Sequence, residues 1–286
     1  TETVEPAIPA DAGDAAEGAP LEAGEELVMP EGTEPTYVAL ETGVDWPAYG
    51  GTHRAMRYSP LDQITPDNVG QLEKIWEFRT GDMPEGDEPF GNQNTPVKVG
   101  DRLYLCSATN HISALDAATG AEFWTYDPGV STDNVGYNAS CRGLVYFEDP
   151  TAERDEICAT RTVNLTHDAR MIALDTETGQ PCPDFGNAGI VNLMEGIGDT
   201  APGFYAPTSP PTLVRDVLVV GSQVSDNQQR TAPSGVIRGY NAVTGELEWA
   251  WDMNRPGENG LPPEGEIYSP GTPNMWTIAS CDDELG

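Results

Sequence analysis

The chain has 286 residues, of which 38% are hydrophobic, so it is long enough to bury the core of one large domain or two smaller ones. It carries 47 Asp and Glu against 14 Lys and Arg, a formal net charge of −33. This balance excludes nucleic acid as a partner, because a phosphate backbone is bound by a net excess of Lys and Arg. No apolar run reaches the roughly 18 residues that a membrane-spanning helix needs.

The first residues differ in composition from the remainder of the chain. Residues 1–45 contain twelve Asp or Glu and no Lys or Arg, together with many Ala, Gly and Pro. So little apolar surface does not offset the entropy cost of ordering a chain. We therefore predict a disordered acidic leader over residues 1–42 and a folded domain over residues 43–286.

Beyond the leader, the predicted elements are short strands with few helix signals. Thr65 and Pro66 predict one short helical turn over residues 65–72, with Thr65 as its N-cap and Pro66 at its first position. Alternating and β-branched apolar residues predict strands at 97–105, 161–165 and 213–220.

Three segments align without gaps and define a repeat of about sixty residues. They are ISALDAATGAEFWTYD from Ile112, MIALDTETGQPCPDFG from Met171 and IRGYNAVTGELEWAWD from Ile237. Each begins as an alternating strand and turns at Thr-Gly, which predicts a β-hairpin whose glycine has φ > 0 and whose Asp or Asn bonds the turn backbone. The glycines are Gly120, Gly179 and Gly245, and the Asp or Asn residues are Asp116, Asp175 and Asn241.

The aromatic residues of the repeat favour one architecture. Trp124 and Trp249 follow their glycines by four residues, where a large ring can pack between neighbouring sheets, whereas the middle copy has Pro183 there and is degenerate. Such units predict an all-β propeller of four-stranded blades. A β-sandwich is the alternative, although it does not explain the constant Thr-Gly to Trp spacing. About four units fit between Asp45 and Gly286, so we expect the N-terminal portion of a longer chain.

The phrase A-L-D-x-x-T-G-x-x-x-W resembles the tryptophan-docking repeat of quinoproteins, the dehydrogenases that use pyrroloquinoline quinone (PQQ). Further phrases occur in order along the chain, including DWPAYGGTHRAMRYSPLDQITPDNVGQL, IWEFRTGD, SCRGLVYF, PTSPP and SPGTPNMW. This series is similar to the membrane-bound PQQ dehydrogenase family that includes glucose and quinate dehydrogenases. The resemblance runs from about Val44 to the end and implies an eight-bladed propeller, of which about four blades are present here.

The resemblance also implies a set of cofactor-binding residues. Trp276 matches the family's tryptophan that stacks on the PQQ ring; a blade-docking Trp is the alternative. Arg142 matches an arginine that pairs with a PQQ carboxylate, a task that suits the guanidinium fork, and Cys141 beside it is expected to line the site. Thr208 and Ser222 are weaker candidates for hydrogen bonds to the cofactor, because Ser and Thr are also common loop residues.

A metal is implied at the polar loop that follows the strand at 213–220. The family places a calcium-binding acid there, which corresponds to Asp226, with Asn227 as a second oxygen donor. Ca²⁺ at the quinone would act as a Lewis acid, and Mg²⁺ is the alternative ion. From the residues alone, an Asx-turn in a solvated loop is the competing interpretation. The family's catalytic base, an Asp of a later blade, has no match in this chain and is expected beyond Gly286.

Asn138 bears on the substrate. Glucose-oxidising relatives carry a His at this position, four residues before Arg142. An amide can bond a sugar but does not titrate near neutral pH, which favours quinate, shikimate or another polyol over glucose. The resemblance implies oxidation of a sugar or cyclic polyol by hydride transfer to PQQ, with ubiquinone as the electron acceptor. It also implies a periplasmic location, tethered to the inner membrane in relatives that have an N-terminal transmembrane domain.

The Cys and His residues give weaker signals. The five Cys form no CxxC pair and the three His are scattered, so neither a zinc ribbon nor a His metal cluster is predicted. Cys158 and Cys182 flank a pair of predicted strands and are candidates for a disulfide, which suits an oxidising periplasm. Cys106 is predicted to be a small buried residue.

A non-catalytic function is the competing hypothesis. In it the propeller keeps the docking repeats as a scaffold for protein partners. It predicts that Arg142, Asp226 and Trp276 do not converge on one site, whereas the dehydrogenase hypothesis predicts that they do.

Overall fold

The computed structural model describes residues 43–82, 90–131, 135, 139–225, 232–271 and 273–286. All of them belong to one compact unit, residues 37–286. The predicted acidic leader, residues 1–42, lies outside the described residues.

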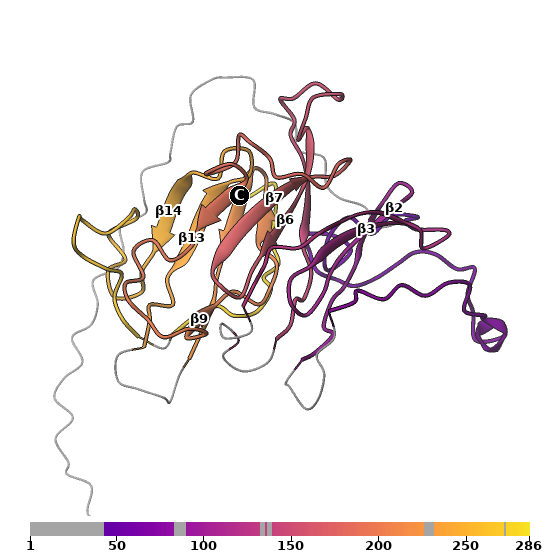
Figure 1. Cartoon of the computed structure of the whole chain (residues 1–286), viewed down its shortest axis with the longest axis horizontal. Helices are drawn as coiled ribbons and strands as arrows, with labels where there is room; N and C mark the ends of the chain where they lie inside the picture. Colours follow the sequence, from indigo (N-terminus) through magenta and orange to yellow (C-terminus); the bar gives the residue numbers. More distant parts are fainter. Residues whose placement is uncertain (1–42, 83–89, 132–134, 136–138, 226–231, 272) are drawn as a thin grey trace, which may run out of the picture. The chain divides into compact units, whose positions relative to one another are not determined.

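Four-stranded antiparallel sheets contain most of the strands (Figure 1). The first sheet consists of β1 (Val97–Val99), β2 (Arg102–Cys106), β3 (Ile112–Asp116) and β4 (Glu122–Tyr126). The second consists of β5 (Val145–Glu148), β6 (Thr160–Leu165), β7 (Arg170–Asp175) and β8 (Ile190–Asn192). The third consists of β10 (Thr212–Val214), β11 (Val217–Val220), β13 (Ile237–Asn241) and β14 (Leu247–Trp251).

Two smaller elements complete the described structure. β9 (Tyr205–Ala206) pairs with β12 (Gln223–Val224) in a two-stranded sheet, and η1 (Val69–Gln71) is a single 3-10 turn. No helix in the described part of the chain is long and apolar enough to cross a membrane.

The four-stranded sheets confirm the predicted all-β architecture of propeller blades. In each sheet the strands are antiparallel and follow one another in chain order. In the third sheet β12 interrupts this order between β11 and β13, and it pairs with β9, which precedes β10. Three such sheets are complete among the described residues, against an expectation of about four. The core lies mainly within and between them: one cluster includes Val163, Met171, Leu218 and Tyr240, and a second includes Tyr104, Ile112 and Trp124.

Some predicted elements differ in extent from the observed ones. The strand predicted at 97–105 divides into β1 and β2, because Gly100 turns the chain with φ 60°. The strand predicted at 213–220 likewise divides into β10 and β11, with Arg215 at φ 56°. The predicted helical turn begins later than expected: its N-cap is Asn68, and the Asn68 side chain bonds the amide of Thr65.

The turn of each repeat has the predicted geometry. Gly120, Gly179 and Gly245 have φ values of 71°, 69° and 70°, in the left-handed region that glycine adopts without steric cost. In all three copies Oδ1 of the preceding Asp or Asn accepts hydrogen bonds of 2.7–3.1 Å from the amides two and three residues later. The side chain therefore substitutes for a backbone acceptor and closes the turn.

Aromatic rings cover two of these glycines. The Trp124 indole lies on Gly179 so closely that a Cβ there would be 2.5 Å from the ring, and its Nε1 donates to the Thr176 carbonyl at 3.0 Å. Trp76 covers Gly120 in the same way, at 2.6 Å from such a Cβ. The predicted docking of Trp124 between sheets is confirmed, whereas the docking ring of Trp76 was not predicted.

In the degenerate middle copy, other apolar residues take the role of the missing docking tryptophan. Pro183 is exposed, and Phe185 and Val191 cover Gly245 instead, at 3.3 and 2.7 Å from a Cβ built on that glycine. Trp249 packs on Gly239 of its own sheet, so among the described residues its expected docking on a neighbouring turn is not seen.

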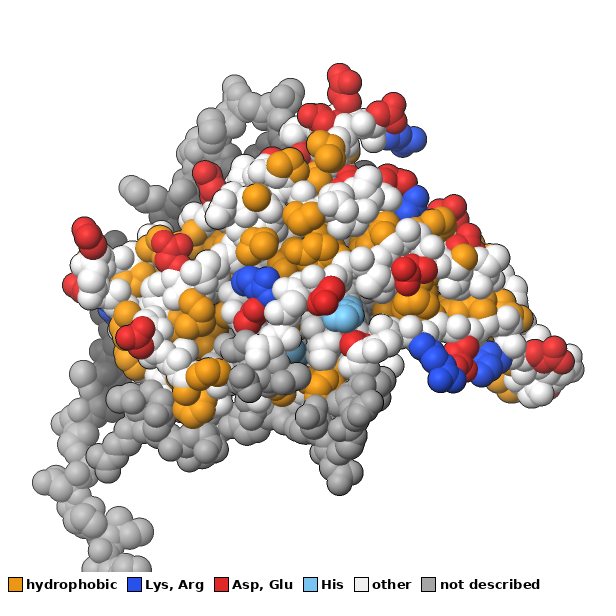
Figure 2. Space-filling view, viewed as in Figure 1, with side chains coloured by type: hydrophobic (Ala, Val, Ile, Leu, Met, Phe, Trp, Pro, Cys, Tyr) orange, Lys and Arg blue, Asp and Glu red, His pale blue; other side chains and the backbone are white. Residues whose placement is uncertain are grey.

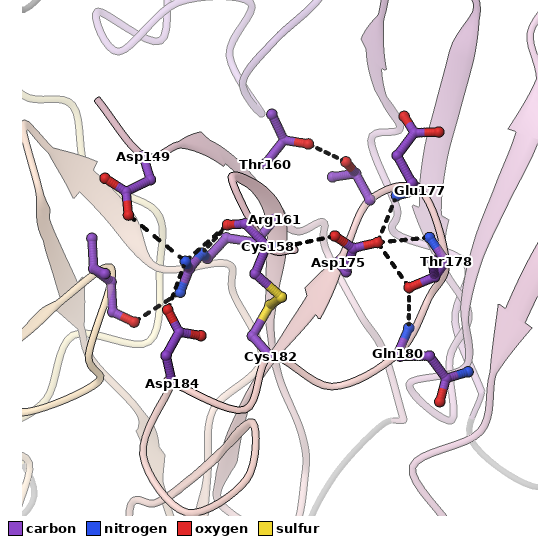
Figure 3. Close-up of a disulfide and its surroundings, with 12 residues drawn as sticks. Asp149, Cys158, Thr160, Arg161, Asp175, Glu177, Thr178, Gln180, Cys182 and Asp184 are labelled. Atoms are coloured by element: carbon purple, nitrogen blue, oxygen red, sulfur yellow. Dashed lines mark hydrogen bonds and ion pairs between the residues drawn. A yellow bond between two sulfur atoms is a disulfide. The ribbon is translucent and has the colours of Figure 1, made fainter. Parts of the chain in front are cut away.

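A buried arginine, Arg161, joins the second and third sheets. Figure 3 shows its guanidinium near Asp149 and Asp184. Arg161 is 1% exposed; its Nε and Nη2 donate to the Cys158 carbonyl, and Nη1 donates to the Val243 carbonyl at 2.8 Å. Nη2 also bonds Asp184 at 3.1 Å. The predicted disulfide between Cys158 and Cys182 is confirmed beside it.

We expect Gly179→Ala to destabilise the fold by about 3 kcal/mol, because left-handed strain of about 1 kcal/mol adds to a clash with the Trp124 ring. Gly100→Ala is the matched control. Gly100 has φ 60° but no atom within 4 Å of its Cβ position, so this variant should lose only the free energy of the backbone strain. Urea unfolding of both variants measures the difference, and equal losses would show that docking contributes nothing.

Candidate functional site

Two covalent or backbone anchors fix the position of Arg142. Cys141 forms a disulfide with Cys106 at the end of β2, and the Arg142 carbonyl accepts a 2.9 Å hydrogen bond from the amide of Thr95. Cys106 is buried as predicted, at 2% exposed, but its disulfide was not predicted. Cys141 is 4% exposed and presents no thiol to the site; it anchors the backbone of Arg142 instead.

The Arg142 side chain meets three residues from two distant segments. Its Nη1 donates to Thr208 Oγ1 and, at 3.4 Å, to Ser209 Oγ. Its Cζ lies 5.2 Å from the centre of the Trp276 ring, within the range of a cation–π contact. Ser209 Oγ in turn donates to the Trp276 carbonyl at 2.8 Å. The structure thus brings together Arg142, Thr208 and Trp276, three of the residues predicted from the sequence.

The charge of Arg142 has no acidic partner among the described residues. Other arginines of the chain do have such partners, as Arg102 has Glu177 and Arg170 has Asp168. Burial lowers the pKa of Arg142 from its usual value, but a guanidinium still carries its proton at neutral pH. Acidic side chains are scattered over the face in Figure 2 and Lys and Arg are few, so an uncompensated cation is unusual for this chain.

Ser222 lies in the same region. It directly precedes β12, whose antiparallel partner β9 ends two residues before Thr208. The adjacent Gly221 is so close to the 275–276 segment that a Cβ would be 2.1 Å from the Met275 carbonyl oxygen. Ser222 is 1% exposed and donates to the Gln223 carbonyl at 3.0 Å, so its hydroxyl proton is engaged locally.

Three predicted site residues cannot be placed. Asn138, Asp226 and Asn227 lie outside the described residues, so their roles stay predictions. The described chain reaches the start of the loop for which a metal is predicted: Ser225 is 3% exposed and its amide donates to the Phe204 carbonyl at 2.9 Å.

A buried histidine supports the segment that carries Arg142. His167 is 2% exposed, and its Nε2 lies 3.2 Å from the Ser140 amide nitrogen and 3.1 Å from the Ala108 carbonyl oxygen. Burial lowers the pKa of His167, so the ring is neutral at pH 7 and uses one of these contacts at a time. Sequence reasoning missed this residue, because a single His in a turn carries no pattern.

Comparison with known proteins decides the family. The model of the PQQ family described as "Glucose/ethanol/alcohol dehydrogenase, beta-propeller domain" matches residues 46–286. The chain belongs to this family.

Several characterised relatives are similar over most of this chain. It is 44% identical over 254 residues to the glycerol dehydrogenase large subunit of Gluconobacter oxydans, which covers 88% of this chain and 34% of that protein. It is 41% identical to the quinoprotein glucose dehydrogenase of Escherichia coli (84% and 31%) and 37% identical to the quinate/shikimate dehydrogenase (quinone) of Acinetobacter baylyi (91% and 34%). The chain therefore spans about a third of the length of these relatives.

Solved structures agree with the fold. The quinohemoprotein alcohol dehydrogenase of Comamonas testosteroni is 26% identical with a TM-score of 0.58, covering 72% of this chain and 27% of that one. A europium-containing methanol dehydrogenase is 25% identical with a TM-score of 0.54, covering 72% and 31%. Both are dehydrogenases whose structures share the blades described above.

The two disulfides offer a direct test of what anchors Arg142. We expect replacement of Cys106 and Cys141 by Ser to cost roughly 3 kcal/mol, and replacement of Cys158 and Cys182 to cost about the same, since the closed loops are of similar length. Only the first pair should accelerate amide exchange at Thr95, whose partner is the Arg142 carbonyl. Hydrogen exchange followed by mass spectrometry measures this, and equal acceleration in both variants would contradict the anchoring role.

Proposed function

We propose that the full-length protein oxidises an alcohol group of a sugar or polyol with PQQ as its cofactor. The observation that carries this proposal is the Arg142 guanidinium, which is half-buried beside the Trp276 ring and lacks a carboxylate partner among the described residues. A cation held in this way is complementary to an anionic, planar ligand.

The residues present fit PQQ, a planar ortho-quinone with three carboxylates. Arg142 uses Nη1 for the hydroxyls of Thr208 and Ser209, which leaves Nε and Nη2 to donate to a carboxylate. Trp276 is 51% exposed, so its ring has a surface on which a flat cofactor could stack. Ser222 would line the site as a buried polar residue, but its hydroxyl already donates to the Gln223 carbonyl and is not free to donate to the cofactor.

The metal remains part of the proposal. Asp226 and Asn227 would supply carboxylate and amide oxygens to Ca²⁺, or to Mg²⁺. A solved relative described as europium-containing supports a hard, oxygen-seeking cation in this fold. The hydrogen bond from the Ser225 amide to the Phe204 carbonyl fixes the chain immediately before Asp226.

The division of chemical work follows from these positions. PQQ, when bound, supplies the hydride acceptor. Arg142 and Trp276 orient it, and Asn138 is proposed to bond a substrate hydroxyl. The proton of that hydroxyl is assigned to an Asp outside this chain. Transfer of electrons to ubiquinone, a periplasmic location and attachment to the inner membrane are further parts of the proposal.

The substrate is proposed only as a class. The relatives named above act, by their names, on glycerol, glucose and quinate or shikimate, and their identities to this chain are similar. What they share is an alcohol carbon that carries hydroxyl neighbours. Asn138 favours a polyol such as quinate over glucose. The scaffold hypothesis is weakened, because Arg142 and Trp276 converge.

We expect Arg142→Gln to weaken PQQ binding to the full-length protein by about 10- to 100-fold, the value of a hydrogen bond to a charged group. Arg142→Lys should be intermediate, because the charge remains and the fork is lost. Arg102→Gln is the control, since Arg102 also lies over an aromatic ring, Phe123, but is paired with Glu177. Titration of the apo-protein with PQQ in Ca²⁺ measures the affinity.

The same preparation tests the substrate class. Dye reduction with glycerol, glucose, quinate and shikimate should show activity with at least one of them, and Arg142→Gln should need more PQQ for the same rate. No reduction with any of the four, despite bound PQQ, would contradict the dehydrogenase proposal. PQQ binding that is unchanged in Arg142→Gln would contradict the site alone.

A further inference from the structure

Three potential metal ligands from two segments that are distant along the chain meet in space. His53, Cys281 and Asp283 each offer one ligand atom, and these atoms all lie within 4.8 Å of one another. His53 Nδ1 is 2.7 Å from Asp283 Oδ2, across a sequence separation of 230 residues. No sequence pattern predicted this cluster, because His53 lies 230 residues from Asp283.

The fold holds these residues in place independently of any ligand. The Cys281 amide donates to the His53 carbonyl at 3.0 Å, which joins the two segments through their backbones. Asp283 Oδ1 accepts from the Arg215 amide at 3.2 Å, and the Asp283 carbonyl accepts from Arg215 Nε at 2.8 Å. Oδ2 is consequently the oxygen that faces His53.

We propose that His53, Cys281 and Asp283 bind one divalent cation of the zinc class, with a fourth position left to water. A thiolate, an imidazole and a carboxylate form the donor set that Zn²⁺ accepts in proteins. Ca²⁺ and Mg²⁺ prefer oxygen donors, so a sulfur ligand separates this site from the one proposed at Asp226. The proposal does not depend on PQQ.

The distances are compatible with a bound ion after small movements. Ligand atoms at about 2.0–2.3 Å from a tetrahedral zinc lie roughly 3.3–3.7 Å apart. His53 and Asp283 would therefore separate by a fraction of an ångström, and Cys281 would approach them. Its thiol now lies 3.0 Å from the Leu213 carbonyl oxygen, a contact that the metal would replace.

Access and charge also favour a cation here. The His53 and Asp283 side chains are 16% and 18% exposed, so an ion can reach them while much of the bulk water is excluded. One thiolate and one carboxylate balance the two positive charges of the ion. Binding releases the thiol proton of Cys281, and the metal takes its place. The bound ion would link residue 53 to residues 281–283.

Cobalt titration of the chelator-treated full-length protein, kept in Ca²⁺, tests the site. We expect a thiolate-to-cobalt charge-transfer band that saturates at one equivalent, and Zn²⁺ should remove it by competition. Among the five cysteines of this chain Cys281 alone is outside a disulfide, and loss of the band in Cys281→Ser assigns the band to this thiol. Zn²⁺ should also raise the melting temperature by a few degrees, because it binds the folded state.

Variants separate the cluster from accidental binding. Cys281→Ser should abolish the band, and His53→Gln and Asp283→Asn should each weaken cobalt affinity at least about tenfold, because each loses a ligand. His111→Gln is the matched control, since His111 also lies beside a carboxylate, Asp127 at 3.1 Å. If Cys281→Ser folds poorly, the other two variants give the answer. No band in the wild-type protein, or full affinity in both His53→Gln and Asp283→Asn, would overturn the proposal.

Discussion

The structure depends on the lack of a side chain at one position of each repeat. At Gly179 a Cβ would lie 2.5 Å from the Trp124 ring, and the capped Thr-Gly turn already requires the left-handed conformation. One residue type therefore satisfies two constraints, a backbone angle and a flat docking surface. The sheets approach one another because this surface is open, and Arg142 can reach Thr208 and Trp276 only when the sheets that carry them are held together.

The boundary between the second and third sheets shows how the fold compensates for a lost indole. Phe185 covers Gly245 but has no nitrogen to donate across the boundary. Two buried arginines supply such bonds: Arg161 donates from the second sheet to the Val243 carbonyl, and Arg238 donates from the third to the carbonyls of Leu193 and Glu195. These charged donors make hydrogen bonds between the second and third sheets, as Trp124 does between the first and second.

Local and distant features differed in how far they could be predicted. The turn glycines, their Asp and Asn caps and the docking of Trp124 were read from spacing, because their determinants lie within a few residues. The meeting of Arg142 with Trp276 followed from a family resemblance, since no local pattern links residues 134 positions apart. The Cys106–Cys141 disulfide and the cluster at His53 were missed, because each depends on how separate sheets are placed in space.

The docking contacts also have a direction along the chain. Trp76 covers Gly120, Trp124 covers Gly179, and Phe185 covers Gly245, so each turn is covered by a residue made earlier during synthesis. When each new hairpin leaves the ribosome, the aromatic residue that covers its turn has already been synthesised. The order of translation and the order of packing therefore coincide, which favours assembly from the N-terminal side, one sheet at a time.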